Sequence, residues 1–312
     1  MENKILGIHH ITAIAGGAKR NFNFYSKILG LRFIKKTVNF DDPGTYHFYF
    51  GDEKGNAGTI LTFFPFGEGI QQGRKGSGMA TEIGYSVPKG SLEFWIKRFE
   101  RHNVIYNKPD VKFGEKYLTF LDPDGLKLEL IESKTTDDRK AWETEDIKID
   151  VATKGFHNIT LTLNNIKATA AILTDVFGYK LIDQEKNRYR FATPAIENAA
   201  IVDLVELPNE RGGHVANGSV HHVAFRVKND EILMHFREVI DTLGLGVTTQ
   251  IDRQYFHSLY FREPGGVLFE IATENPGFTI DETLENLGTA LKLPPKYETS
   301  REQIESLLVK IN

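Results

Sequence analysis

Hydrophobic and polar positions along the chain follow a pattern that recurs four times. In its first copy, an apolar run at residues 7–15 predicts a strand, and Phe22, Tyr25 and Leu29 then follow at helical spacing. Gly30 stands where such a helix ends. Three further extended stretches, separated by Gly and Pro clusters, complete the copy. The pattern therefore predicts a unit of one strand, one helix and three strands (βαβββ).

The same unit returns at residues 79–133, 154–207 and 217–273, each time with one helix in the same position. The letters repeat as well: FLDPDGLKLEL in the second unit matches FREPGGVLFEI in the fourth, with Glu129 over Glu270. One such unit leaves a curved sheet with an open edge, so units are expected to pair. The expected fold is α+β, with four βαβββ modules that form two paired half-barrel domains around cavities.

The order of the modules predicts four segments of chain. Residues 1–133 carry modules one and two, and residues 154–273 carry modules three and four. The polar, charged segment 134–153 is the expected linker between them. Residues 274–312 fall outside the repeat and predict a loop followed by a helical tail. This tail either packs on the outside or covers a cavity as a lid.

Composition narrows the class of protein. The chain has 312 residues, and its net charge of −4 comes from mixed signs, so no basic surface for nucleic acid is expected. It contains no cysteine, which excludes disulfides, thiolate metal sites and a cysteine nucleophile. The first residues lack the apolar core of a signal peptide, and no apolar run approaches the ~18 residues of a membrane helix. We therefore expect a cytoplasmic protein that binds neither nucleic acid nor membranes.

Two histidine pairs open apolar strands, and a glutamate interrupts a third strand. Because side chains alternate along a strand, His10 shares a face with Thr12, and His222 occupies the matching position in module four. Glu270 lies in an apolar strand, a costly place for an uncompensated charge. Two imidazoles and one carboxylate are the set typical of non-haem Fe(II), with Mn(II), Zn(II) and Ni(II) as alternatives. For each residue alone, a core histidine or an outward-facing glutamate is the ordinary alternative.

Modules two and three provide an internal control. Module three has Asn158 at the ligand position, and module two has Glu82 or Thr81 there, although it keeps Glu129. These residues supply no second two-histidine set, so the sequence predicts one metal ion per chain and one degenerate cavity. Because the three candidate ligands must meet around one ion, modules one and four are expected to share one half-barrel.

Three further residues are candidates for chemistry near the metal. Tyr260 lies one strand before Glu270 and would hydrogen-bond a phenolate-like substrate or donate a proton, with a core aromatic as the alternative. Arg253 would balance a substrate anion, or pair with a carboxylate at the surface. Strict alternation places it on the face opposite Tyr260 unless it precedes the strand. Thr12, in phase with His10, would contact the substrate, or is an ordinary strand threonine.

Three other histidines, His9, His221 and His47, are not expected to bind the metal. Alternation places His9 and His221 in the opposite packing layer, as structural residues or hydrogen-bond partners of the ligands. His47 has no supporting context in the sequence, and no role is expected for it.

The chain resembles a known superfamily in three motifs: HHIT at residues 9–12, HHVAF at 221–225 and FREPGGVLFEIAT at 261–273. Together with the four modules they are similar to the vicinal oxygen chelate superfamily of glyoxalases, bleomycin resistance proteins and extradiol dioxygenases. The resemblance covers roughly residues 5–275. Within the superfamily it points to two-domain dioxygenases that cleave hydroquinone-type rings. It implies Fe(II) ligands His10, His222 and Glu270, substrate contacts by Arg253 and Tyr260, and Thr12 in the pocket.

The leading hypothesis is an Fe(II)-dependent ring-cleaving dioxygenase that takes a small hydroquinone- or catechol-type aromatic and O₂. Such an enzyme would serve aromatic-compound degradation or quinone detoxification. Two alternatives remain open. One is a glyoxalase-like lyase, isomerase or thiol transferase that uses Zn, Mn or Ni at the same site, and the other is a non-catalytic quinone-binding protein. A homodimer is compatible with paired half-barrels.

Overall fold

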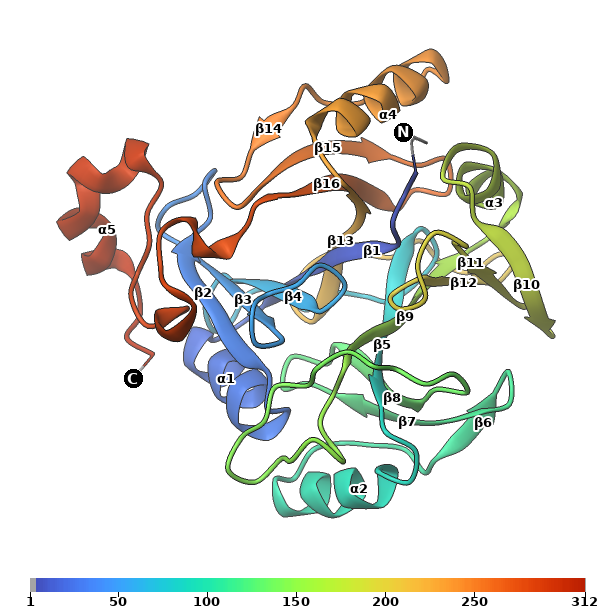
Figure 1. Cartoon of the computed structure of the whole chain (residues 1–312), viewed down its shortest axis with the longest axis horizontal. Helices are drawn as coiled ribbons and strands as arrows, with labels where there is room; N and C mark the ends of the chain where they lie inside the picture. Colours follow the sequence, from blue (N-terminus) through green and yellow to red (C-terminus); the bar gives the residue numbers. More distant parts are fainter. Residues whose placement is uncertain (1–3, 312) are drawn as a thin grey trace.

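The computed structural model of the chain describes residues 4–311, which form two curled eight-stranded sheets (Figure 1). The first sheet has the strand order β14-β15-β16-β13-β1-β4-β3-β2. Modules one and four therefore share one half-barrel, which confirms the pairing that the candidate ligands required. Its strands are β1 (Ile8–Ala15), β2 (Arg32–Val38), β3 (Tyr46–Gly51), β4 (Ile60–Pro65), β13 (Ser219–Val227), β14 (Ile251–Asp252), β15 (Phe256–Arg262) and β16 (Leu268–Pro276).

The second sheet is built in the same way from modules two and three, in the order β10-β11-β12-β9-β5-β8-β7-β6. Antiparallel β5 and β9 join its two modules, as β1 and β13 do in the first sheet. Each half-barrel thus draws one module from residues 1–133 and one from residues 154–273. Its strands are β5 (Met79–Val87), β6 (Asp110–Lys112), β7 (Glu115–Leu121), β8 (Lys127–Glu132), β9 (Gly155–Leu163), β10 (Lys180–Glu185), β11 (Arg188–Ala192) and β12 (Ile201–Glu206).

The module helices lie outside the curled sheets, and their apolar faces join the alternate strand residues in one large core cluster (Figure 1). In modules one and three the helix ends in a π-helical turn, followed by Gly30 and Gly178 with φ of 73° and 75°. Among the described residues, no helix is long and apolar enough to cross a membrane. The helical segments are α1 (Ala18–Asn23), η1 (Phe24–Ile28), α2 (Leu92–Arg101), α3 (Lys167–Ala171), η2 (Ile172–Val176) and α4 (Asp230–Thr242).

Two strands are shorter than the pattern predicts. The extended stretch at 104–113 contains only the three-residue β6, because Pro109 has no N–H for a ladder bond. The stretch at 246–251 leads only to the two-residue β14. There the Thr248 hydroxyl accepts the N–H of Tyr260 at 3.0 Å, so a side chain replaces part of the backbone pairing.

The C-terminal segment enters the first half-barrel before it reaches the outside. Phe278 stacks on Tyr255 with ring centroids 5.0 Å apart. The buried Lys35 of β2 holds the segment through Asp281 at 2.6 Å and Glu282 at 2.5 Å. The last helix then packs outside against β2 (Figure 1). The tail elements are η3 (Phe278–Ile280), η4 (Leu284–Asn286), η5 (Pro295–Ser300) and α5 (Arg301–Leu307).

Candidate metal centre

His10, His222 and Glu270 meet at the centre of the first sheet, on the adjacent strands β1, β13 and β16. The Nε2 atoms of His10 and His222 lie 3.2 and 2.8 Å from Glu270 Oε2, and 3.4 Å from each other. All three side chains are buried. Among residues 4–311 they form the one group of histidine, cysteine or acidic side chains whose ligand atoms converge, within 4.8 Å of one another. Residues from opposite ends of the chain are thus brought to one point.

The chemistry of this group fits a divalent metal. Glu270 Oε1 accepts a hydrogen bond from the Ser258 hydroxyl, but the buried Oε2 has no hydrogen-bond donor. Burial acts to raise the pKa of Glu270, but His10 and His222, when these rings carry a positive charge, hold it well below its usual range. Burial lowers the pKa of His222. The site therefore offers an ionised carboxylate oxygen that needs a cationic partner, next to imidazole nitrogens, which is the donor set of a metal centre.

Each of the two candidate ligand histidines is oriented by its neighbour in the sequence. His9 Nε2 lies 3.0 Å from the Thr273 carbonyl, which can only accept, so this nitrogen carries the proton. His9 Nδ1 therefore accepts from His10 Nδ1 at 2.8 Å, which leaves the lone pair of His10 Nε2 free for a metal. His221 Nδ1 lies 2.8 Å from His222 Nδ1 in the same arrangement. Burial lowers the pKa of both His9 and His221 to about 3, so both rings are neutral.

The expectation that His9 and His221 lie in the opposite packing layer is wrong. In the β1–β13 ladder Ile8 pairs with Phe225 and His10 with Ala224, so His9 is an extra residue in a β-bulge. His221 is also an extra residue in a bulge, because Thr12 pairs with His222 and Ala13 pairs with Val220. A bulge interrupts the alternation of side chains, and both histidines therefore reach the ligands on the inner face. Simple alternation in the sequence carries no sign of such an insertion.

A cavity of about 410 Å³ opens beside the candidate ligands His10 and His222, and we call it the front cavity. Arg253 lies between β14 and β15, outside the strand proper, so its side chain turns to the same side as Tyr260. Its Nε donates to the Tyr260 hydroxyl at 3.2 Å, and its Nη1 lies 3.3 Å from Asp41. The residues that line this cavity include His10, His47, His222, Arg253, Phe256 and Tyr260.

The electrostatics of the front cavity suit an anionic aromatic. Partial burial acts to lower the pKa of Arg253, but Tyr260 and Glu270 raise it above its usual range, so the guanidinium stays charged. Burial, reinforced by Glu270, raises the pKa of Tyr260, so its hydroxyl stays protonated. The cavity therefore presents a fixed cation and a neutral hydroxyl donor beside the candidate metal ligands.

Thr12 and His47 belong to a hydrogen-bonded row beside the site. The Tyr49 hydroxyl lies 2.9 Å from His47 Nδ1, and His47 Nε2 lies 2.9 Å from the Thr62 hydroxyl, which donates to Thr12 at 2.8 Å. Thr12 is fully buried and is linked to His47 by the Thr62 hydroxyl. His47, in contrast, lines the front cavity itself. Sequence reasoning missed His47, although its alternation with Tyr49 on one strand was a usable signal.

The second half-barrel has the same geometry with different residues. By strand register Glu82 stands where His222 does, Asn158 where His10 does, and Glu129 where Glu270 does, while Thr81 is a bulge residue. Four cationic and four acidic side chains fill its interior. They are Lys112, Lys127, Arg188 and Arg190, which pair with Glu129, Glu82, Asp203 and Glu115.

Lysine and arginine side chains balance the acidic groups of the second half-barrel. Lys112 Nζ bonds the Glu129 carboxylate directly, so the counterpart of Glu270 is balanced by a lysine. Although burial acts to raise it, the pKa of Glu82 is held at about 2 by Arg188 and Lys127. The degenerate cavity predicted from the sequence is therefore a filled and charge-balanced interior.

Comparison with known proteins places the chain in a family. The sequence model of the Glyoxalase/Bleomycin resistance protein/Dioxygenase superfamily matches residues 7–130 and 155–271. A candidate ring-cleaving dioxygenase of Bacillus subtilis, MhqO, is 45% identical over 99% of this chain and 97% of that protein. The chlorohydroquinone/hydroquinone 1,2-dioxygenase of Sphingobium indicum is 34% identical over 97% of this chain and 96% of that protein.

A solved structure agrees with these matches. The crystal structure of a candidate dioxygenase from Bacillus subtilis superposes with a TM-score of 0.94 at 44% identity, and covers 99% of this chain and 98% of the other. The expected fold of paired half-barrels and the expected enzyme class, a dioxygenase, are confirmed. The chain belongs to the glyoxalase/bleomycin resistance protein/dioxygenase superfamily.

Proposed function

We propose that this protein is an Fe(II)-dependent ring-cleaving dioxygenase that acts on a hydroquinone-type aromatic in the cytoplasm. The observation that carries the proposal is the buried set of His10, His222 and Glu270 at a cavity that also presents Arg253 and Tyr260. Two neutral imidazoles and one carboxylate suit Fe(II) and leave coordination positions open. The name of the relative from Sphingobium indicum, which acts on chlorohydroquinone and hydroquinone, supports this class of substrate.

The side chains of the cavity have distinct roles in this reaction. When bound, Fe(II) would supply a path for electrons from the aromatic ring to O₂. Arg253 provides the positive charge that binds a phenolate oxygen, and its hydrogen bond fixes the Tyr260 hydroxyl. Tyr260 remains protonated and donates a hydrogen bond to the ring oxygen. Cleavage inserts both atoms of O₂ and breaks the ring bond beside a hydroxyl-bearing carbon.

Oxygen uptake by the iron-loaded protein tests the proposal. The protein is loaded with Fe(II) without air and mixed with O₂ and hydroquinone, chlorohydroquinone or catechol. We expect uptake that stops when His10→Ala removes a ligand and continues in His235→Ala, which removes an exposed histidine on α4. No uptake by a protein with iron bound would exclude the function. Turnover that survives when zinc replaces iron would point instead to a lyase, isomerase or transferase.

A further inference from the structure

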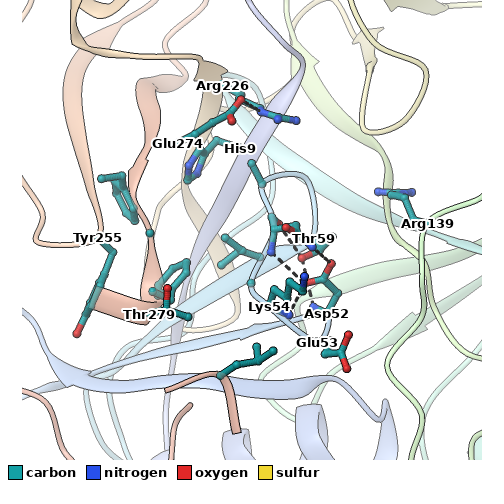
Figure 2. A pocket seen from close by; sticks show the side chains of 18 of the residues that line it. His9, Asp52, Glu53, Lys54, Thr59, Arg139, Arg226, Tyr255, Glu274 and Thr279 are labelled. Atoms are coloured by element: carbon teal, nitrogen blue, oxygen red, sulfur yellow. Dashed lines mark hydrogen bonds and ion pairs between the residues drawn. The ribbon is translucent and has the colours of Figure 1, made fainter. Parts of the chain in front are cut away.

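A second cavity, of about 930 Å³, opens into the same half-barrel, and we call it the rear cavity (Figure 2). Figure 2 shows His9 beneath Arg226 and Glu274, with the loop that carries Asp52 and Lys54 facing them across the space. Lys54 and Glu274 are exposed, so the cavity communicates with solvent. The proposed reaction assigns no role to the rear cavity.

The two cavities occupy opposite ends of the central strands. On β13 the front cavity touches His222 and the rear cavity touches Arg226, and on β16 they touch Leu268 and Glu274. On β4, which runs parallel to β1, they touch Phe64 and Ile60. The metal ligands therefore lie between two openings of one half-barrel.

Three of the four cationic side chains that line the rear cavity are held in ion pairs. Arg226 pairs with Glu274 at 2.6 Å, and Lys140 pairs with Glu53 at 2.7 Å. Arg139 is held by Asp137 at 2.7 Å. The fourth, Lys54, is exposed on the surface loop, so the inner part of this space is better suited to solvent and small neutral molecules than to an anion.

A thin apolar partition separates the rear cavity from the metal site. Phe256 lines both cavities, and its ring centroid lies 5.1 Å from that of His9 and 4.9 Å from that of His10. Apart from these two histidines, the side chains packed around it are hydrophobic and buried, and two of them come from the C-terminal segment. This cluster comprises Ile34, Tyr49, Ile60, Ala224, Tyr255, Phe256, Ala272, Phe278 and Leu287.

We propose that O₂ reaches the metal through the rear cavity and past Phe256, while the aromatic substrate enters by the front cavity. This inference rests on the proposed function. An aromatic bound in the 410 Å³ front cavity covers the approach to the ligands from that side, yet O₂ has to arrive while it is bound. An apolar partition one ring thick excludes water and ions but admits an apolar diatomic molecule.

A single introduced thiol tests the route, because the chain contains no cysteine. Ala57→Cys places it in the wall of the rear cavity, and fluorescein maleimide then fills part of the space. In the iron-loaded enzyme we expect the adduct to raise the KM for O₂ about fivefold or more, with the KM for hydroquinone within about twofold. The same adduct on Leu207→Cys, an exposed position that lines neither cavity, is expected to change neither value. An unchanged KM for O₂ in the active Ala57→Cys adduct would overturn the route.

A second measurement uses the metal-free protein, so it does not depend on the reaction. 1-Naphthol is bound in the front cavity as a fluorescent aromatic, and the quenching of its emission by O₂ is followed by lifetime. The route predicts slower quenching in the Ala57→Cys adduct than in the Leu207→Cys adduct. Equal quenching would refute the route even if ring cleavage is found. Slower quenching without any O₂ uptake by the iron-loaded enzyme would keep the route and reject the proposed function.

Discussion

Lys112→Met removes the cation that balances Glu129, and its effect follows from burial. The Lys112 and Glu129 side chains are 7% and 2% exposed. Methionine is of similar length but has no charge, so three cations remain for four acidic groups in this interior. Removing one partner of a buried pair costs about 3–5 kcal/mol, because the other charge is left uncompensated. Arg188 also acts on Glu129, so we expect the lower end, about 3 kcal/mol.

Thermal unfolding at pH 7 in a chelator measures this loss. A destabilisation of about 3 kcal/mol corresponds to a Tm lower by about 6–12 °C. The matched rescue is the double variant Lys112→Met/Glu129→Gln, which removes both charges and is expected within about 1 kcal/mol of the parent. A loss below about 1 kcal/mol in the single variant, or a double variant no more stable than the single one, would refute the idea that Lys112 balances Glu129 there.

Three more predictions concern the first half-barrel. Arg253→Met is expected to raise the KM for the aromatic about 10–100-fold in steady-state kinetics, since a hydrogen bond to a charged group contributes about 1.5–3 kcal/mol, and a change below threefold would contradict it. Ser258→Ala frees Glu270 Oε1 and is expected to weaken Fe(II) binding about 10-fold or more in metal titrations, whereas unchanged affinity would show that this contact does not orient the ligand. Burial holds the pKa of His47 well below 6.5, so below pH 6.5 the unfolded chain binds more protons and the metal-free protein loses stability as pH falls. His47→Gln is expected to reduce that slope by up to about 1 kcal/mol per pH unit in unfolding curves from pH 7 to 5, and an identical slope would be the contrary result.

The convergence of His10, His222 and Glu270 and the module pairing were predictable from the sequence, because they depend on a repeat and on the phase of strands. His10 and His222 occupy one position of the repeated unit, and Glu270 is the carboxylate of the matching last strand. If these three residues bind one ion, modules one and four must share a half-barrel. The strand order of the first sheet agrees with this pairing.

The orientation of the other histidines was not predictable in the same way. His9 and His221 are bulge residues, and an inserted residue leaves no trace in an alternating pattern. Arg253 shares the front cavity with Tyr260 because β15 begins only at Phe256, a boundary that periodicity locates poorly.

The charged interior of the second half-barrel was also not predictable from the sequence pattern. Charged residues such as Lys112 and Arg190 are typical of exposed strand faces, and only the curled sheet turns them inward against acidic partners. The entry of Phe278 into the first half-barrel depends on the path of the tail, which has no periodicity to read.

The central claim is that one Fe(II) is held between His10 Nε2, His222 Nε2 and Glu270 Oε2. The most direct measurement is a crystal structure of the protein loaded with Fe(II) without air, with anomalous differences recorded on either side of the iron absorption edge. We predict a single iron peak per chain, bonded to those three atoms, and none beside Glu129. A protein that takes up iron but shows no peak at His10, or shows one in the second half-barrel, would contradict the account.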